Sequence, residues 1–380
     1  MKLPTISVIM ATYNHADFVA QAIESVLGQI GVDFEFLIAD DGSVDRTRDI
    51  ISSFHDERIS FFPNEVNRGA CLVTNELIQR ASGEFIALIN SDDYWTDDSK
   101  LSYQLQVLRE NPAVGACFGR AKFVDKEGIE IDKSALPFGS VFDQQNRSQG
   151  QWLRRFFDLG NCICHPTILI RKSCYQELGD YDNRLRQLPD FHMWVRLIKR
   201  YNIFVSDRTF IAFRQLPGEN ASAGTADNMT RLHNESYFVL RDFFDDISQS
   251  VFLDGFGDLF RGNGIATPEV IEIEKAFIYF TGERWASHVY NLIGLEKLYD
   301  LSGKQPYKKY LVDNFDFNDC DLYALAAKVG TFDLVKSNNG LTSVQGKLLL
   351  AEVTKRCVRR SPVWLRPILT RIFWRYMEGV

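Results

Sequence analysis

Four apolar, β-branched segments in the first 90 residues each end in a cluster of polar residues, and this repeat restricts the fold more than any other feature. The segments are residues 6–11, 34–40, 58–63 and 84–89. Helical patterns lie between them and begin near residues 18, 45 and 67. Strands that alternate with helices predict a Rossmann-like α/β fold, with a mostly parallel sheet and helices on both faces.

The polar clusters at the strand ends are TYN (12–14), DDGS (40–43), NRG (67–69) and NSDD (90–93). In a parallel sheet the carboxyl ends of the strands lie at one edge, and open α/β folds bind ligands there. The sequence therefore predicts one crevice lined by all four clusters. Asp92 and Asp93 are adjacent carboxylates directly behind a buried strand, where like charges repel and desolvation is costly. A compensating charge is expected beside them.

The second half of the chain has a different pattern. Helical segments are expected at 151–161 and 189–202, and strands at 166–172 and 209–213. Residues 214–228 are rich in Gly, Ala, Ser and Asn, which indicates a boundary or a mobile loop. We therefore predict an α/β domain over 1–225, with halves 1–120 and 121–225, and a mainly helical domain over 226–380.

Composition argues against several classes of protein. A formal net charge of -7 argues against general attraction to nucleic acid. No apolar run reaches the roughly 18–20 residues that span a bilayer, and the N-terminus lacks the pattern of a signal peptide. The 7 cysteines are odd in number and scattered, which predicts free thiols in a reducing cytoplasm. Cys162 and Cys164, beside His165, do not have the usual zinc-site spacing.

The motifs ISVIMATYN, ADDGSVDRT, NRGA and ASGEFIALINSDDYW, in this order and spacing, resemble the nucleotide-sugar-binding half of a family 2 glycosyltransferase. HPTILIRK, GDYD and LPDFHMWVRL resemble the acceptor-side region of the same family. The resemblance covers roughly residues 4–215. It implies a GT-A fold and transfer of a sugar from a nucleotide-diphosphate donor, with inversion at the anomeric carbon.

The resemblance also implies a function for the paired carboxylates. The diphosphate is the leaving group, and Mg²⁺ or Mn²⁺ would stabilise its growing negative charge. Such ions often use only one or two carboxylates, together with phosphates and water. By resemblance Asp93 binds the metal, and Asp92 contacts the ribose or supports the metal through water. The family often has another acid at Asn90. The alternative is a loop of solvated acids before a helix.

By the same resemblance, Asp41 accepts a hydrogen bond from the ring imide of the base. Uracil offers such an N–H and so do thymine and guanine, and a UDP-sugar is the favoured donor. The alternative for Asp41 is a turn or a helix cap. Tyr13 would stack on the base or pack at the strand end, and Arg68 would bind the nucleotide or cap a helix. The full set of expected donor-binding residues is Ala11, Thr12, Tyr13, Asn14, Asp41, Gly42, Asn67, Arg68 and Asp92.

An inverting displacement needs a base that takes the proton of the acceptor hydroxyl. In the family this base is a carboxylate before a Trp and a basic residue, and Asp190 matches it here, ahead of Trp194 and Arg196. Pro189 and His192 stand where the family often has acids. Asp190 also resembles a helix N-cap, and the two roles are compatible. Contacts to the acceptor or the diphosphate are expected from His165, His192 and Arg214, with structural roles as the alternative.

Residues 355–380 are basic and aromatic within an acidic protein. They predict peripheral contact with anionic lipid, and the alternative is a terminal helix docked on the catalytic domain. An anchor would suit a lipid-linked saccharide acceptor at the inner face of the cytoplasmic membrane. We therefore expect a cytoplasmic glycosyltransferase that builds a surface polysaccharide or lipopolysaccharide.

Two other functions fit parts of this pattern. A nucleotidyltransferase would also use a strand-end aspartate pair and a metal, but it needs a Gly-rich basic loop that residues 10–18 lack. A non-catalytic sugar-nucleotide-binding or scaffold protein would not need Asp190.

Overall fold

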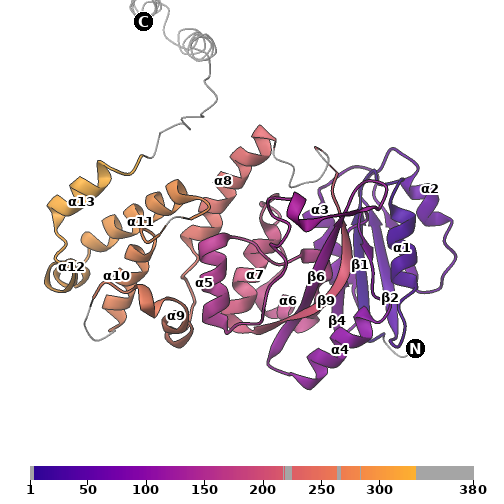
Figure 1. Cartoon of the computed structure of the whole chain (residues 1–380), viewed down its shortest axis with the longest axis horizontal. Helices are drawn as coiled ribbons and strands as arrows, with labels where there is room; N and C mark the ends of the chain where they lie inside the picture. The colour runs from indigo at the N-terminus through magenta and orange to yellow at the C-terminus, as the bar shows by residue number, and fades with distance from the viewer. Residues whose placement is uncertain (1–3, 217, 219–224, 263–266, 283, 331–380) are drawn as a thin grey trace, which may run out of the picture. The chain divides into compact units, whose positions relative to one another are not determined.

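The computed structural model describes residues 4–216, 218, 225–262, 267–282 and 284–330. Within them, one 9-stranded sheet forms the centre of the N-terminal half (Figure 1). Its first four strands in sequence pair in parallel, in the order β3-β2-β1-β4. They are β1 (Ile6–Thr12), β2 (Phe34–Asp40), β3 (Ile59–Pro63) and β4 (Phe85–Leu88). The expected α/β architecture is confirmed.

The rest of the sheet is mixed. β8 (Leu169–Arg171) pairs antiparallel with β4 and with β6 (Val114–Val124), and β9 (Asn202–Arg214) runs parallel to β6. β5 (Tyr94–Trp95) and β7 (Glu130–Ile131) are short additions to β9 and β6. Because two antiparallel steps separate β4 from β6, the long strands β6 and β9 run in the same direction as β4. Their carboxyl ends therefore lie at the same edge as those of β1, β2 and β4.

Helices cover both faces of the sheet, as expected. Alternate β1 residues enter opposite cores, with Val8 and Met10 on one side and Ile9 on the other. The first core also holds residues of α1 (Val19–Leu27), α2 (Thr47–Ser52) and α4 (Lys100–Glu110). The second holds residues of α3 (Ala70–Arg80), α5 (Gln149–Leu159), α6 (Lys172–Leu178) and α7 (Pro189–Arg200).

The chain beyond β9 is helical, which confirms the expected helical C-terminal region. Its helices are α8 (Ala226–Arg241), α9 (Gln249–Phe256), α10 (Pro268–Ile278), α11 (Ser287–Ser302), α12 (Tyr307–Phe315) and α13 (Asp319–Ala326). Phe157 of α5 joins this region to the sheet half, because its ring packs against aromatic rings of the helical region. Its partners lie 4.9–5.6 Å away and are Phe243, Phe244, Phe256, Tyr279 and Tyr290. The division at residue 225 stays a prediction.

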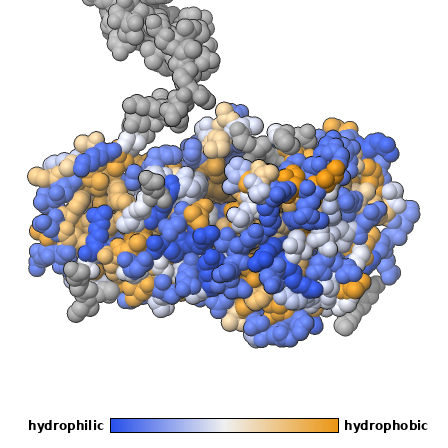
Figure 2. Space-filling view, in the orientation of Figure 1, coloured by the Kyte–Doolittle hydropathy of each residue, from blue (hydrophilic) through white to orange (hydrophobic). Residues whose placement is uncertain are grey.

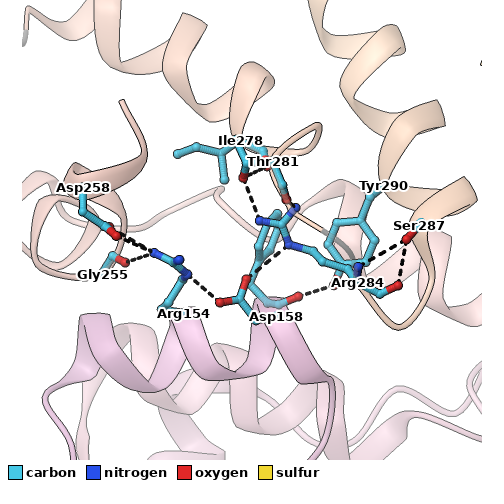
Figure 3. Close-up of polar contacts among 10 residues, drawn as sticks. Arg154, Asp158, Gly255, Asp258, Ile278, Thr281, Arg284, Ser287 and Tyr290 are labelled. Carbon is cyan, nitrogen blue, oxygen red and sulfur yellow. Dashed lines mark hydrogen bonds and ion pairs between the residues drawn. The ribbon is translucent and has the colours of Figure 1, made fainter. Parts of the chain in front are cut away.

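A polar network crosses the same contact (Figure 3). Arg154 donates from Nε to Asp158 at 2.6 Å and from Nη1 to Asp258 at 3.0 Å, and Arg284 donates from Nε to Asp158 at 3.2 Å. These arginines and aspartates therefore neutralise one another. Arg154 and Asp158 line a hollow of about 560 Å³ between α5 and α9. The network fixes α5, whose C-terminal end leads to the site described below.

Hydrophilic and hydrophobic residues are interspersed over the face shown in Figure 2. No helix in the described part of the chain is long and apolar enough to cross a bilayer. Its cysteines are free thiols, as expected. The basic aromatic segment 355–380 lies outside the described residues, as do residues 217 and 219–224 of the predicted boundary segment.

Candidate active site

The loops that follow β1, β2 and β4 meet at one edge of the sheet. Thr12 pairs with Asp40 at the ends of β1 and β2, and Ile9 pairs with Leu88 at the end of β4. The N–H of Asp41 donates to the carbonyl of Thr12 at 2.8 Å. The polar clusters of the sequence therefore converge because the parallel strands end together.

Asp41 links two of these clusters. Its Oδ1 accepts the N–H of Arg68 and its Oδ2 accepts the N–H of Gly69, both at 2.8 Å. The side chain is only 1% exposed. Asp41 thus holds the NRG loop against the DDGS turn, and its contact with a base stays a prediction.

Gly42 is required by this arrangement. Its φ is +80°, in the left-handed region that favours glycine. A Cβ at this position would lie 2.5 Å from the carbonyl carbon of Val66 and 2.6 Å from the nitrogen of Asn67. The two loops therefore approach too closely for any side chain. On the other side of the turn, Asp40 accepts from Ser43 N at 3.0 Å and from Arg48 Nε at 2.6 Å.

Asn14 joins the TYN loop to the same turn. Its N–H donates to Ser43 Oγ at 2.8 Å, and its Oδ1 accepts the N–H of Val44 at 2.9 Å. Three apolar side chains stay exposed on these joined loops: Tyr13 at 41%, Val44 at 87% and Val66 at 64%. Ala11 and Thr12 belong to β1, and Asn67 is exposed. Arg68 pairs with Glu76 of α3.

The two adjacent aspartates have different surroundings. Asp93 is 2% exposed, and its oxygens accept the N–H of Arg214 at 2.8 Å and the Nδ2 of Asn90 at 3.0 Å. Burial, and then the charge of Asp92, raise the pKa of Asp93 well above its ordinary value. Asp92 is half-buried. An amide at position 90 fits here because it donates to Asp93, whereas an acid would repel it.

Arg214 is the last residue of β9, and its side chain holds the loop that contains Asp92 and Asp93. It is 2% exposed, and its Nε donates to the carbonyl of Asp92 at 2.9 Å. Its Nη1 donates to the carbonyl of Asp125 at 3.0 Å, and its Nη2 donates to Gln21 Oε1 at 2.7 Å. The guanidinium also lies over the ring of Phe18. These contacts favour a structural role over the expected contact with the diphosphate.

Asp190 occupies the first turn of α7, one residue after Pro189. Its Oδ2 accepts Asn161 Nδ2 at 2.7 Å, and its Oδ1 accepts the N–H of Phe191 at 2.7 Å. Burial raises the pKa of Asp190 to about 6, although both hydrogen bonds oppose the shift. A carboxylate with this pKa is suited to accept a proton near neutral pH.

Cys164 is a buried thiol that both Asp93 and Asp190 influence. Burial raises the pKa of its thiol well above the ordinary value, and the charges of Asp93 and Asp190 raise it further. Both acids therefore lie within electrostatic reach of one buried residue. Cys164 belongs to the loop 160–164, which starts at the C-terminal end of α5.

The two histidines of the region differ. His165 Nε2 lies 2.9 Å from Tyr181 Oη, and its ring packs edge-on against Trp194 at 5.5 Å. His192 Nδ1 is buried and has no hydrogen-bond partner within the described residues. Burial lowers the pKa of both histidines to about 4, so both rings are neutral at pH 7. The ring of His165 thus has a hydrogen-bond partner in the protein, whereas Nδ1 of His192 has none among the described residues.

The described residues contain no group of three or more His, Cys, Asp or Glu side chains that could hold a metal ion. Asp92 and Asp93 nevertheless fit Mg²⁺ or Mn²⁺ bound together with phosphate oxygens, because such sites need only one or two carboxylates. Asp93 already accepts two hydrogen bonds, whereas no hydrogen bond to the Asp92 carboxylate occurs among the described residues. Asp92 is therefore the freer ligand of the pair.

Asn161 and Glu235 were not predicted from the sequence. Asn161 belongs to no motif, and its contact with Asp190 depends on the loop after α5. Glu235 accepts hydrogen bonds from the loop before α7, 47–49 residues away in the chain. No local pattern in the sequence indicates either contact.

Comparison with known proteins is consistent with this geometry. A model described as glycosyl transferase family 2 matches residues 7–178. TuaG of Bacillus subtilis, provisionally assigned as a teichuronic acid biosynthesis glycosyltransferase, is 36% identical over 242 residues, which are 63% of this chain and 88% of TuaG. The UDP-Glc:α-D-GlcNAc-diphosphoundecaprenol β-1,3-glucosyltransferase WfgD of Escherichia coli is 26% identical over 241 residues, 63% of this chain and 87% of WfgD.

A solved structure is similar as well. The crystal structure of Staphylococcus aureus TarS 1-349 in complex with UDP-GlcNAc superimposes with a TM-score of 0.52 and 16% identity, over 96% of this chain and 86% of that chain. At this identity the likeness concerns the fold alone, and it confirms the expected GT-A fold.

Proposed function

The chain belongs to glycosyl transferase family 2 and is a glycosyltransferase, and on that premise we propose that it moves a sugar from a UDP-sugar to a hydroxyl of a lipid-linked saccharide, with inversion. The observation that carries this proposal is the convergence of the loops after β1, β2 and β4 at one edge of the sheet. Asp92 and Asp93 follow β4 there, and the charges of Asp93 and Asp190 both raise the pKa of the buried Cys164 thiol.

The donor half of the proposal rests on the joined loops after β1, β2 and β3. Tyr13, Val44 and Val66 expose apolar surface there, which a planar base would cover. WfgD carries UDP-Glc in its name, and a uracil ring offers an imide N–H to Asp41. We propose the diphosphate at Asp92, with Asn67 and Arg68 at the edge of the nucleotide.

Mg²⁺ or Mn²⁺ would supply positive charge against the leaving diphosphate when it is bound. Asp92 would hold the ion as its main protein ligand. Asp93 would orient the loop through Arg214 and Asn90 and add its negative charge. This differs from the expectation that Asp93 is the main ligand, because the hydrogen bonds of Asp93 leave Asp92 freer.

Asp190 acts as the general base in this proposal. The acceptor hydroxyl oxygen attacks the anomeric carbon as its proton passes to a carboxylate oxygen of Asp190, and the bond from that carbon to the diphosphate oxygen breaks. Asn161 keeps one oxygen of Asp190 oriented throughout.

The acceptor class rests on WfgD, whose name specifies α-D-GlcNAc-diphosphoundecaprenol. A lipid-linked saccharide lies at a membrane surface, where the basic aromatic segment 355–380 would bind anionic lipid. We accordingly propose a cytoplasmic protein that associates with the inner face of the membrane and contributes to surface polysaccharide or lipopolysaccharide.

The test is calorimetric titration of UDP-glucose, UDP-N-acetylglucosamine and GDP-mannose into the protein, with and without Mn²⁺, followed by transfer to α-D-GlcNAc-diphosphoundecaprenol. The proposal expects Mn²⁺-dependent binding of a UDP-sugar that Asp190→Asn keeps while transfer stops. Binding of GDP-mannose alone would overturn the UDP assignment. Transfer that survives in Asp190→Asn would overturn the base.

A further inference from the structure

Glu235 of α8 is a buried carboxylate that binds three successive backbone N–H groups of the loop before α7. Its Oε1 accepts from Arg186 at 2.9 Å, and its Oε2 accepts from Gln187 at 2.7 Å and from Leu188 at 2.9 Å. Only 4% of Glu235 is exposed. These three residues directly precede Pro189 and Asp190, so the helical region holds the backbone that leads to the base.

We infer that Glu235 is a positioning residue for Asp190, an inference that rests on the proposed role of Asp190 as base. The N-terminus of α7 has no cap of its own, because the N-cap is Leu188 and its side chain cannot accept a hydrogen bond. Pro189 has no N–H to be oriented. The carboxylate of Glu235 instead holds the backbone that enters the helix, through the N–H of Leu188 and of the two residues before it, and it brings a negative charge near the helix N-terminus.

The other supports of this loop hold its beginning. Asn75 of α3 donates to the carbonyl of Tyr181 at 2.8 Å and accepts its N–H at 3.1 Å. Arg196 of α7 donates to the carbonyls of Leu178 and Asp180 at 2.7 Å and 2.8 Å. The end of the loop, at residues 186–188, is held from α8.

A second residue of α8 takes part in this support. Asn228 Oδ1 accepts Gln187 Nε2 at 3.2 Å. Two residues of α8 thus bind the loop that sets the start of α7. Since the orientation of Asp190 follows from the position of this helix start, the helical region completes the site of the α/β half. A small displacement of a general base lowers the reaction rate strongly, so the contacts of α8 with this loop should matter for the rate of transfer.

The test compares Glu235→Gln with the matched control Glu296→Gln. Glu296 of α11 accepts Tyr237 Oη of α8 at 2.8 Å, so its variant removes a charge from the same helical region without touching the loop. In Glu235→Gln one oxygen becomes an NH₂ group that faces backbone N–H donors. We expect kcat for UDP release from UDP-glucose or UDP-N-acetylglucosamine to fall about tenfold or more. The Kd for UDP with Mn²⁺ should stay within about twofold, because α8 holds the base side of the site.

The acid limb of the pH–rate profile separates positioning from a merely structural role. It should shift in Glu235→Gln, where the surroundings of Asp190 change, and stay in place in Glu296→Gln. Unchanged kcat and pH profile in folded Glu235→Gln, with Asp190→Asn inactive, would overturn this inference alone. An active Asp190→Asn would overturn the proposed base and this inference with it.

If Glu235→Gln does not fold, hydrogen exchange on the wild-type protein tests the inference instead. The amides of Arg186, Gln187 and Leu188 should exchange slowly although they lie outside a helix or strand, because each donates to a buried carboxylate. Exchange at the rate of a free loop would overturn it.

Discussion

Asn161 Nδ2 donates a hydrogen bond to Asp190 Oδ2 at 2.7 Å, and the N–H of Ile163 donates to Asn161 Oδ1 at 3.2 Å. The second bond identifies the oxygen of the Asn161 amide, so its NH₂ group faces the carboxylate. An NH₂ donor stabilises the ionised form of Asp190, while burial destabilises it. The balance leaves the pKa of Asp190 raised to about 6.

Transfer should therefore lose rate as the pH falls through about 6, because a protonated Asp190 cannot accept the proton of the acceptor. Asn161→Ala removes a donor that lowers this pKa, so the acid limb should move to higher pH. Initial rates from pH 5 to 8 at saturating donor check both points. An acid limb that stays in place in Asn161→Ala would contradict the role of the amide.

The raised pKa of Asp190 should make the stability of the wild-type protein depend on pH, relative to Asp190→Asn. The pKa of Asp190 is 3.8 when unperturbed and about 6 in the fold, so wild-type stability falls as the pH rises through this window. The loss is about 1–2 kcal/mol for a partly exposed group. In urea unfolding, wild-type stability should fall by that amount relative to the variant between pH 3.5 and pH 7.5. A difference between the two proteins that does not change with pH would refute the raised pKa.

The sequence predicted those parts of the site that depend on strand order. Asp41 and Asp92 follow buried apolar strands, and parallel strands bring their ends to one edge. The polar clusters therefore meet whatever the details of their loops. The sequence did not predict β6, an 11-residue strand, because Gly115 and Gly119 interrupt its run of apolar residues. These glycines are explained by close contacts with Tyr201 and Phe210, which only the fold reveals.

Roles that depend on distant partners were not predictable. Arg214 ends a strand, as expected, but its guanidinium points to carbonyls near residues 92 and 125 rather than to open space. Asp93 is paired with Arg214 across 121 residues, and this pairing distinguishes it from Asp92. Neighbouring residues with the same side chain can thus have different functions, because the tertiary contacts decide which of them is free.

Asp92→Ala and Asp93→Ala should separate metal binding from stability. Asp92→Ala should leave stability within about 0.5 kcal/mol and weaken Mn²⁺-dependent UDP binding by about tenfold or more. Asp93→Ala should cost about 2–4 kcal/mol, because it leaves the Arg214 N–H and the Asn90 amide without their acceptor. Urea unfolding and calorimetry measure the two effects. Loss of Mn²⁺ dependence in Asp93→Ala alone would make Asp93 the main ligand, as the motif suggests.

Arg214→Lys tests whether this arginine supports the loop or binds the diphosphate. A lysine cannot reproduce donors to the Asp92 carbonyl, the Asp125 carbonyl and Gln21 together, so we expect a loss of about 2–4 kcal/mol in stability. A diphosphate contact would instead show as weaker UDP binding with unchanged unfolding.

Gly42→Ala should be among the most damaging single-atom additions in the donor site. The new methyl group would lie 2.5 Å from the carbonyl carbon of Val66, at a residue whose φ of +80° is itself unfavourable for alanine. Gly69→Ala is the matched control, because its φ is +97° but nothing lies within 4 Å of the new Cβ. Both variants carry a conformational cost of about 1–3 kcal/mol, and only Gly42→Ala should also separate the two loops. We expect Gly42→Ala to lose at least about 2 kcal/mol more stability and most UDP affinity. Equal effects of the two variants, measured by unfolding and calorimetry, would show that close loop contact is not what the donor site requires.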